Sequence, residues 1–157
     1  LVLLLKDFKN GSYAFHNMKN ELKKHMAECC EMTIRPEDLE VIEPVFVKIS
    51  IHVWLGVKMV TNSMEVHDLW KSRIEDYLEP VKDTMHHGWK IGTLPKESQI
   101  KMMLNSLETD SVLQNFLIRA VYQDDTGVHE TSLDNVCISP YMVCCNGTHR
   151  IIISELL

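Results

Sequence analysis

The fold of this chain is decided by the run Val45-Phe-Val-Lys-Ile-Ser-Ile-His-Val-Trp54, in which apolar residues alternate with a more mixed set. Because successive side chains of a β-strand point to opposite faces, this alternation predicts a strand with one apolar face. The core face would hold the β-branched residues Val45, Val47, Ile49, Ile51 and Val53. The other face would hold Phe46, Lys48, Ser50, His52 and Trp54. Since this second face is mixed, we expect a sheet with one partly solvated side.

Upstream of this strand the sequence predicts a short strand, a helix and a linker. Residues 1–6 form a compact apolar run that is typical of a short buried strand. Residues 15–29 have an apolar stripe at helical spacing, which predicts an amphipathic helix. The members of that stripe are Phe15, Met18, Leu22 and Met26. Residues 32–40 contain Pro36 and are interpreted as a linker.

Two further helices are predicted downstream of the central strand. Asn62 and Glu65 have the spacing of a capping pair, so a helix should begin there and run to about Glu79, where Pro80 ends it. The next helix should begin with Pro95 in its first turn, because proline is favoured at that position. Its buried side would be formed by Ile100, Met103, Leu104 and Leu107.

The last third of the chain is predicted to be mainly β-structure. Residues 112–122 alternate well enough for a second long strand, and residues 123–135 are interpreted as a polar loop. Residues 140–145 and 148–154 flank Asn146-Gly147, the dipeptide typical of a tight turn, so we expect a C-terminal β-hairpin. Taken together, the order of elements predicts an α+β fold, in which amphipathic helices pack on a mixed or antiparallel sheet.

The composition is that of an ordinary folded domain. The chain has 157 residues, of which 45% are hydrophobic and 24% charged, so it can bury a core without disulfides. We expect a single domain over residues 1–157, or two lobes of about 1–57 and 58–157 that share a core. A net charge of −6 argues against nucleic acid, which favours a basic surface. No run approaches the roughly 18 apolar residues of a membrane helix, so no membrane span is expected.

The cysteines and the start of the chain bear on its cellular context. Five cysteines are present, four of them in the adjacent pairs Cys29-Cys30 and Cys144-Cys145. They form no spaced disulfide framework, which favours reduced thiols in the cytoplasm. The chain begins without methionine, inside an apolar run that is too short for a signal peptide. We therefore expect it to be a fragment of a longer protein.

The candidate reactive groups are explained better by structural roles. His86-His87 lacks the i, i+4 spacing of a metal-binding pair, so a solvated loop is favoured. A zinc site that combined Cys137, Cys144 or Cys145 with His149 would match no known spacing, and small buried cysteines explain the same residues. Asp124-Asp125 lacks the calcium-loop pattern. We therefore expect no catalytic residues, metal ligands or cofactor.

The long loop between the second and third predicted helices is unusual because it has a Gly88-Trp89-Lys90-Ile91-Gly92 centre. Ordering a long loop costs backbone entropy, so its residues need a purpose. Trp89 has two interpretations of equal weight. It could fold inward and hold the loop on the sheet, or it could anchor a neighbouring subunit, since tryptophan is enriched at interface hot spots.

Several motifs share their order and spacing with one known family. They are residues 41–53, the helix end with Ile74, Tyr77, Leu78 and Pro80, the loop with Gly88, Trp89, Ile91, Gly92, Leu94, Pro95, Gln99 and Ile100, and the final segment with Gly147 and His149. This set resembles the C-terminal part of the baseplate J-like proteins, which form the wedges of contractile phage tails and injection machines. The chain departs from that family at residues 81–87, which are shorter and more polar than the usual glycine-rich insert.

The resemblance implies a mechanical function. Such a protein would be a structural, non-enzymatic subunit that joins hub, sheath and neighbouring wedge proteins or associates with itself. It would be assembled in the cytoplasm and would end in a phage tail or an injection particle. The resemblance implies structural or interface roles for Trp54, Tyr77, Pro80, Gly88, Trp89, Ile91, Gly92, Pro95, Gly147 and His149. Two other functions stay open: a small-molecule-binding or regulatory α+β domain, and an enzyme that uses the cysteines and histidines.

The same interpretation predicts where neighbouring subunits would bind. A scaffold domain should expose more apolar surface than a monomer needs. We expect this surface on the mixed face of the strand at residues 45–54. The second candidate is the face of the strand at residues 112–122 that carries Leu117, Arg119 and Val121.

Overall fold

The structure is a computed structural model that describes most of the chain. The described residues are 11–29, 42, 44–58, 62–79, 88–107, 111–124 and 126–156. The chain divides into two compact units, Leu1–Pro44 and Val45–Leu157. The strand predicted at residues 1–6, the linker at 32–40, Pro80 and the His86-His87 pair lie outside the described residues.

The first unit contains helix α1, Gly11–Cys29, which confirms the helix predicted over residues 15–29. Met18, Leu22 and Met26 are half-buried and lie on one side of this helix, as their spacing requires. His25 and Cys29 are one turn apart, and 3.6 Å separates the Cys29 Sγ from the His25 Nε2.

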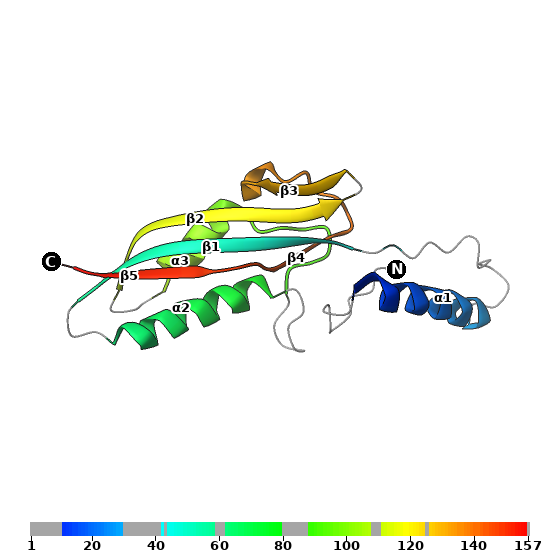
Figure 1. Cartoon of the computed structure of the whole chain (residues 1–157), viewed down its shortest axis with the longest axis horizontal. Coiled ribbons are helices and arrows are strands. Elements are labelled where there is room, and N and C mark those ends of the chain that lie inside the picture. The colour runs from blue at the N-terminus through cyan, green and yellow to red at the C-terminus, as the bar shows by residue number, and fades with distance from the viewer. Residues whose placement is uncertain are drawn as a thin grey trace. The chain divides into compact units, whose positions relative to one another are not determined.

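The second unit has an α+β fold built on a five-stranded mixed sheet (Figure 1). Its elements in chain order are β1 (Val45–Val57), α2 (Ser63–Leu78), α3 (Glu97–Asn105), β2 (Ser111–Asp124), β3 (Gly127–Thr131), the short 3₁₀ helix η3 (Leu133–Asn135), β4 (Met142–Asn146) and β5 (Arg150–Glu155). The predicted fold class is therefore confirmed, as are the central strand, the second helix and the second long strand.

Strand β1 is the centre of the sheet and has partners on both sides. It pairs with β2 antiparallel along its length, and β3 follows β2 at that edge of the sheet. On its other side β1 pairs parallel with β4 and then, further along, parallel with β5. The alternating pattern is confirmed, because Val47, Ile49, Ile51 and Val53 are fully buried. A shift in the β1–β2 register falls between Trp54 and Leu55.

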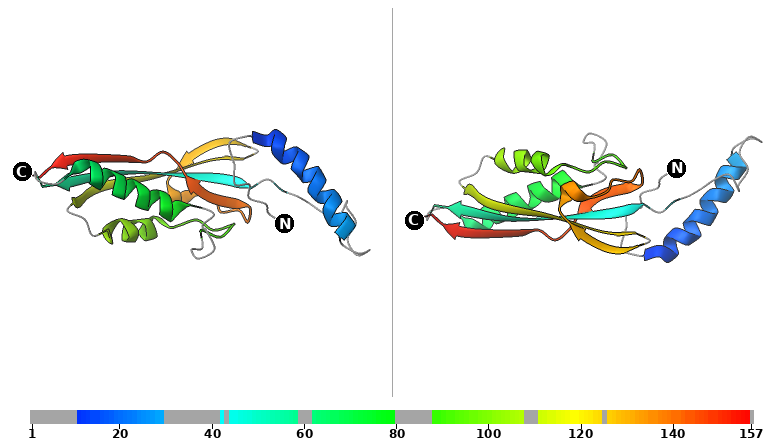
Figure 2. Two further views of the ribbon diagram at one scale, coloured as in Figure 1. Left: turned by 90° about the horizontal axis from the view of Figure 1, so that it is seen from below. Right: turned by 90° about the horizontal axis from the view of Figure 1, so that it is seen from above.

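Both helices of this unit cover the same face of the sheet (Figure 2). Helix α2 begins at Asn62, whose side chain accepts a hydrogen bond from the Met64 N–H, as the predicted cap requires. The residues that these helices bury are Val66, Trp70, Ile74 and Leu78 from α2, and Ile100 and Leu104 from α3. They pack with the apolar face of β1 and β2 in one core. The indole N–H of Trp70 donates to the Ser111 hydroxyl across that core, at 3.1 Å.

The predicted C-terminal hairpin is wrong. Strands β4 and β5 do not pair with each other, because each pairs parallel with β1. Gly147 has no positive φ, which a hairpin turn would need. It is required for a different reason: a Cβ on Gly147 would lie 2.9 Å from the Ile49 carbonyl oxygen. The Asn146-Gly147 pair therefore marks a break between two strands that run in the same direction.

Two smaller predictions also need correction. The polar loop predicted over residues 123–135 contains strand β3 and helix η3. The strand is short and begins at Gly127, whose φ of 131° suits glycine, so it gives little periodic signal. Pro95 does not occupy the first turn of α3, because Lys96 is the N-cap and Glu97 begins the helix. Pro95 instead lies buried just before the cap.

Candidate functional site

The long loop folds inward at Trp89. The indole N–H of Trp89 donates to the Tyr77 carbonyl oxygen at 2.9 Å. The Tyr77 and Trp89 rings meet edge to face, with 5.6 Å between their centroids. Trp89 is half-buried and packs against the main core. Of the two interpretations of Trp89, these contacts favour the inward one, in which the indole holds the loop against the last turn of α2.

Gly92 lets the same loop turn and approach strand β4. Its φ of 76° is a value that glycine adopts without strain, and the Thr93 N–H closes the turn on the Lys90 carbonyl oxygen at 3.0 Å. The Gly92 N–H donates to the Met142 carbonyl oxygen at 2.8 Å. A Cβ at Gly92 would lie 3.0 Å from the Pro140 carbonyl oxygen. Gly88 and Ile91, the other predicted residues of this loop, are half-buried beside it.

The end of the loop caps helix α3 and is tied to helix η3. The Gln99 side chain accepts a hydrogen bond from the Lys96 N–H at 2.8 Å. The Asp134 carboxylate accepts one from the Glu97 N–H at 3.1 Å. This contact of Asp134 was not predicted, because its partner Glu97 is distant in sequence. Trp89, Gly92 and Gln99 of this region therefore make internal contacts.

His149 bonds the segment between β4 and β5 to the central strand β1. Its Nδ1 accepts a hydrogen bond from the Ile51 N–H of β1 at 3.2 Å, and its Nε2 lies 3.1 Å from the Asn146 Oδ1. Since Nδ1 accepts, the ring proton sits on Nε2 and is donated to Asn146. Burial, together with the nearby His52 and Lys71, lowers the pKa of His149 from 6.5 to about 4. The imidazole is therefore neutral near pH 7.

Further hydrogen bonds join the segment between β4 and β5 to helix α2 and to strand β1. The Asn146 Nδ2 donates to the Glu75 carbonyl oxygen at 3.0 Å, and the Thr148 N–H donates to the Ser50 hydroxyl at 3.0 Å. The Gly147 N–H donates to the Ile49 carbonyl oxygen at 2.9 Å. The backbone groups at the break are thus satisfied partly by side chains and partly by the backbone of β1. Gly147 and His149, which the sequence singled out, have structural roles here.

The other candidate reactive groups show no reactive arrangement in the described residues. Burial raises the pKa of Cys144 to about 12 and that of Cys145 to about 11, so both thiols stay protonated near pH 7. No three potential ligands gather to hold a metal ion among the described residues. Asp124 accepts hydrogen bonds from Thr126 and His129 at the β2–β3 turn, which lower its pKa to about 2. The sequence did not single out His129.

The face of the sheet opposite the helices is an exposed surface with apolar character. It is not covered by any helix of the second unit among the described residues (Figure 2). Trp54 lies there, half-buried, and is paired in register with Ile152 of β5. Leu117 of β2 is paired with His52 and is 40% exposed, while Ile152 is 43% exposed. Trp54 and Leu117 belong to the two strand faces that the sequence predicted, whereas Ile152 was not predicted to lie there.

Polar side chains border this apolar group. Arg119 and Glu130 form an ion pair at 2.6 Å between β2 and β3. Both side chains are more than half exposed, so the pair contributes little to stability. An apolar centre with a polar margin is the usual anatomy of a protein–protein interface. We call Trp54, Leu117 and Ile152 the open-face cluster.

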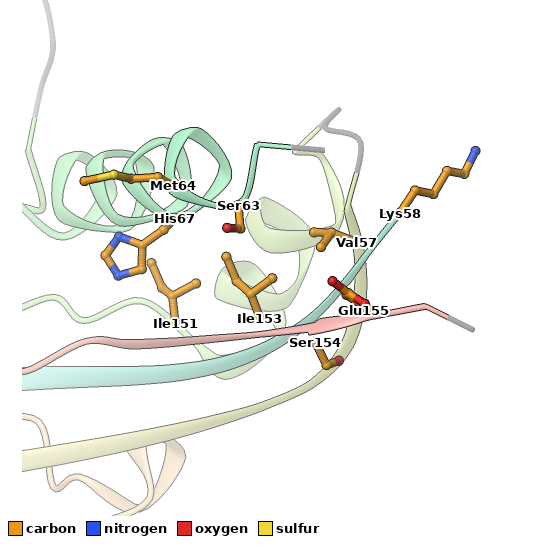
Figure 3. Close-up of a pocket in the computed structure, with 9 residues that line it drawn as sticks. All are labelled: Val57, Lys58, Ser63, Met64, His67, Ile151, Ile153, Ser154 and Glu155. Carbon is orange, nitrogen blue, oxygen red and sulfur yellow. The ribbon is translucent and has the colours of Figure 1, made fainter. Parts of the chain in front are cut away.

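A hollow lies on the side of strand β5 that faces helix α2. It is a groove of about 550 Å³ between the first turns of α2 and the strands β1 and β5 (Figure 3). The residues that line it are Val57, Lys58, Ser63, Met64, His67, Ile151, Ile153, Ser154 and Glu155. Its volume falls within the range of ligand sites, but its outer side is open to solvent (Figure 3).

Comparison with known proteins leaves the function to be argued from the chain itself. No protein-family model matches the chain, and no curated protein matches it. Among the residues that the structure describes, no helix has both the length and the apolar character needed to cross a bilayer.

Proposed function

We propose that this protein is a non-catalytic structural subunit of a contractile-tail or injection-machine baseplate wedge. In this role it contacts hub, sheath and neighbouring wedge subunits and is assembled in the cytoplasm. The observation that carries the proposal is the open-face cluster: Trp54, Leu117 and Ile152 share a sheet face that no described helix of the second unit covers. Apolar side chains grouped in this way favour a surface for another protein.

The resemblance to the baseplate J-like proteins supplies the kind of assembly. The motif residues that carry it form one continuous structural unit, which runs from Tyr77 through Trp89 and Gly92 to strand β4. A unit of this kind makes the domain rigid, because each loop contact ties a different element to the sheet. Rigidity is what a subunit needs if it is to transmit a movement from one neighbour to another.

Purification of intact particles tests this proposal. Cells that produce contractile particles would express a tagged full-length form of the protein, either unchanged or with Leu117→Glu and Ile152→Glu together. We expect the unchanged protein to co-purify with sheath and hub proteins and the double variant to be lost at least about ten-fold, since charges in an apolar interface are costly. Met102→Glu is the matched control, because Met102 is 72% exposed on the helix side.

Two results would refute the proposal. The first is complete, contractile particles that lack this protein. The second is normal incorporation of the double variant, which would show that the open-face cluster makes no contact in the particle. Thermal unfolding of each purified variant shows whether a loss of incorporation comes from a loss of folding.

A further inference from the structure

The outer edge of the sheet is closed along β4 and open along β5. Beside β4 the Gly92 N–H bonds to the Met142 carbonyl oxygen, and the Asn146 side chain bonds to the Glu75 carbonyl oxygen of α2. Strand β5 pairs with β1 on one side and with no described strand on the other. A strand edge of this kind presents a row of backbone donors and acceptors that another chain can bond.

The two outer edges of the sheet differ in how they are protected. At the opposite edge, β3 carries His129 and Glu130, and polar or charged side chains of this kind discourage another strand from pairing. Strand β5 has charged residues at its two ends, Arg150 and Glu155, and the uncharged run Ile151-Ile-Ile-Ser154 between them. The β5 edge is therefore the better place for an added strand.

The groove described above lies along this open edge. Ile151 and Ile153 point from β5 toward α2, while Ser154 points the other way (Figure 3). Met64 and His67 border the groove from the helix. Ile151 and Ile153 are only half-buried, so apolar surface is left for another side chain to cover. A helix beside this strand edge leaves a slot whose walls combine the apolar Ile151, Ile153 and Met64 with polar residues such as His67 and Glu155.

We propose that this slot binds an extended peptide segment of a neighbouring subunit, which adds to the sheet beside β5. Backbone hydrogen bonds to β5 would supply affinity, and every second side chain of the segment would enter the groove between Ile151, Ile153 and Met64. The segment therefore carries apolar residues at alternate positions. The backbone groups of β5 on the side without a described partner strand can bond one extended chain, so we assign the slot to a peptide segment and not to the folded body of a second copy.

This inference deepens the proposed function, since it names one contact that such a scaffold makes. Its test uses purified protein with a random peptide library displayed on phage, followed by synthetic copies of the enriched peptides. We expect enriched peptides with alternating apolar residues. Met64→Glu should weaken their binding at least about ten-fold, because it places a charge on the apolar wall. Met102→Glu is the control, since Met64 and Met102 are 73% and 72% exposed on helices.

Hydrogen exchange supplies an independent readout that needs no variant. Bound peptide should slow the exchange of β5 amides and leave the β3 amides unchanged. The inference is overturned by a library that yields no alternating peptide, by binding that tolerates Met64→Glu, or by protection at β3. Self-association lost in Met64→Glu would assign the slot to a second copy and would also overturn it. If peptides bind β5 but the protein is absent from particles, only the proposed function fails.

Discussion

Replacing His149 by alanine should destabilise the protein, and the effect should depend on pH. The imidazole accepts the Ile51 N–H of the central strand and lies 3.1 Å from the Asn146 oxygen. In His149→Ala the Ile51 N–H loses its partner at a place where no neighbouring strand can replace it. A buried donor left without a partner costs about 1–3 kcal/mol, so we expect a loss of about 2 kcal/mol at pH 7.5.

The pH dependence follows from the lowered pKa. Burial keeps the folded-state pKa of His149 at about 4, below the ordinary 6.5 of the unfolded chain. Between these values the unfolded state binds a proton that the folded state excludes, so stability falls as the pH falls. The full difference corresponds to about 3 kcal/mol. Because the ring is partly exposed to solvent, we expect about half of this, about 1.5 kcal/mol, to be lost between pH 7.5 and 4.5.

Urea unfolding of the wild type and His149→Ala at several pH values measures this difference. The free-energy gap between the two proteins should be about 2 kcal/mol at pH 7.5 and should narrow to well under half of that at pH 4.5. His67→Ala is the control, since the His67 side chain is 43% exposed and makes only a surface contact with Asp68. A gap that stays constant over this range would refute a neutral, hydrogen-bonded imidazole at the break.

Three further outcomes are expected. Gly147→Ala should lower the free energy of unfolding by about 1–3 kcal/mol in urea, because its Cβ would crowd the neighbouring strand; an unchanged midpoint would contradict the close approach. Trp89→Phe should cost about 1 kcal/mol through its lost hydrogen bond, and Trp54→Phe should cost less; equal costs in thermal unfolding would count against the inward role of Trp89. A thiol reagent should modify the exposed Cys137 quickly and the buried Cys144 only after unfolding, and fast labelling of both would disprove that burial.

The conspicuous loop around Trp89 is explained largely by contacts within the domain. Trp89 and Gly92 each make a hydrogen bond that fixes the loop to another element, whereas Gln99 bonds locally to Lys96 at the start of α3. Motif residues of this kind identify a fold more directly than a binding surface. The surfaces proposed for partners, the open-face cluster and the β5 edge, lie largely on residues outside the loop motif.

Local sequence patterns were enough to predict strand β1 and helix α2. The alternation at residues 45–54, the capping Asn62 and the apolar stripe of α2 each depend on neighbours within one or two turns, so the sequence contains the whole signal. The same reasoning missed β3, because a short edge strand that begins at a glycine has too few alternating residues to stand out. The mixed face of β1 was predicted from the same alternation at residues 45–54. In the structure it is the sheet face opposite the helices.

What the sequence by itself determined is therefore the α+β class, the core face of β1 and the positions of its main helices, since these follow from periodicity along the chain. Only the tertiary structure decided that Asn146-Gly147 separates two parallel strands, because that choice depends on β1, which lies about a hundred residues earlier. The Ile51 N–H and the Ser50 hydroxyl bond the segment around the break, and these partners outweigh the local preference of Asn-Gly for a hairpin. The same long-range pairing leaves the β5 edge open.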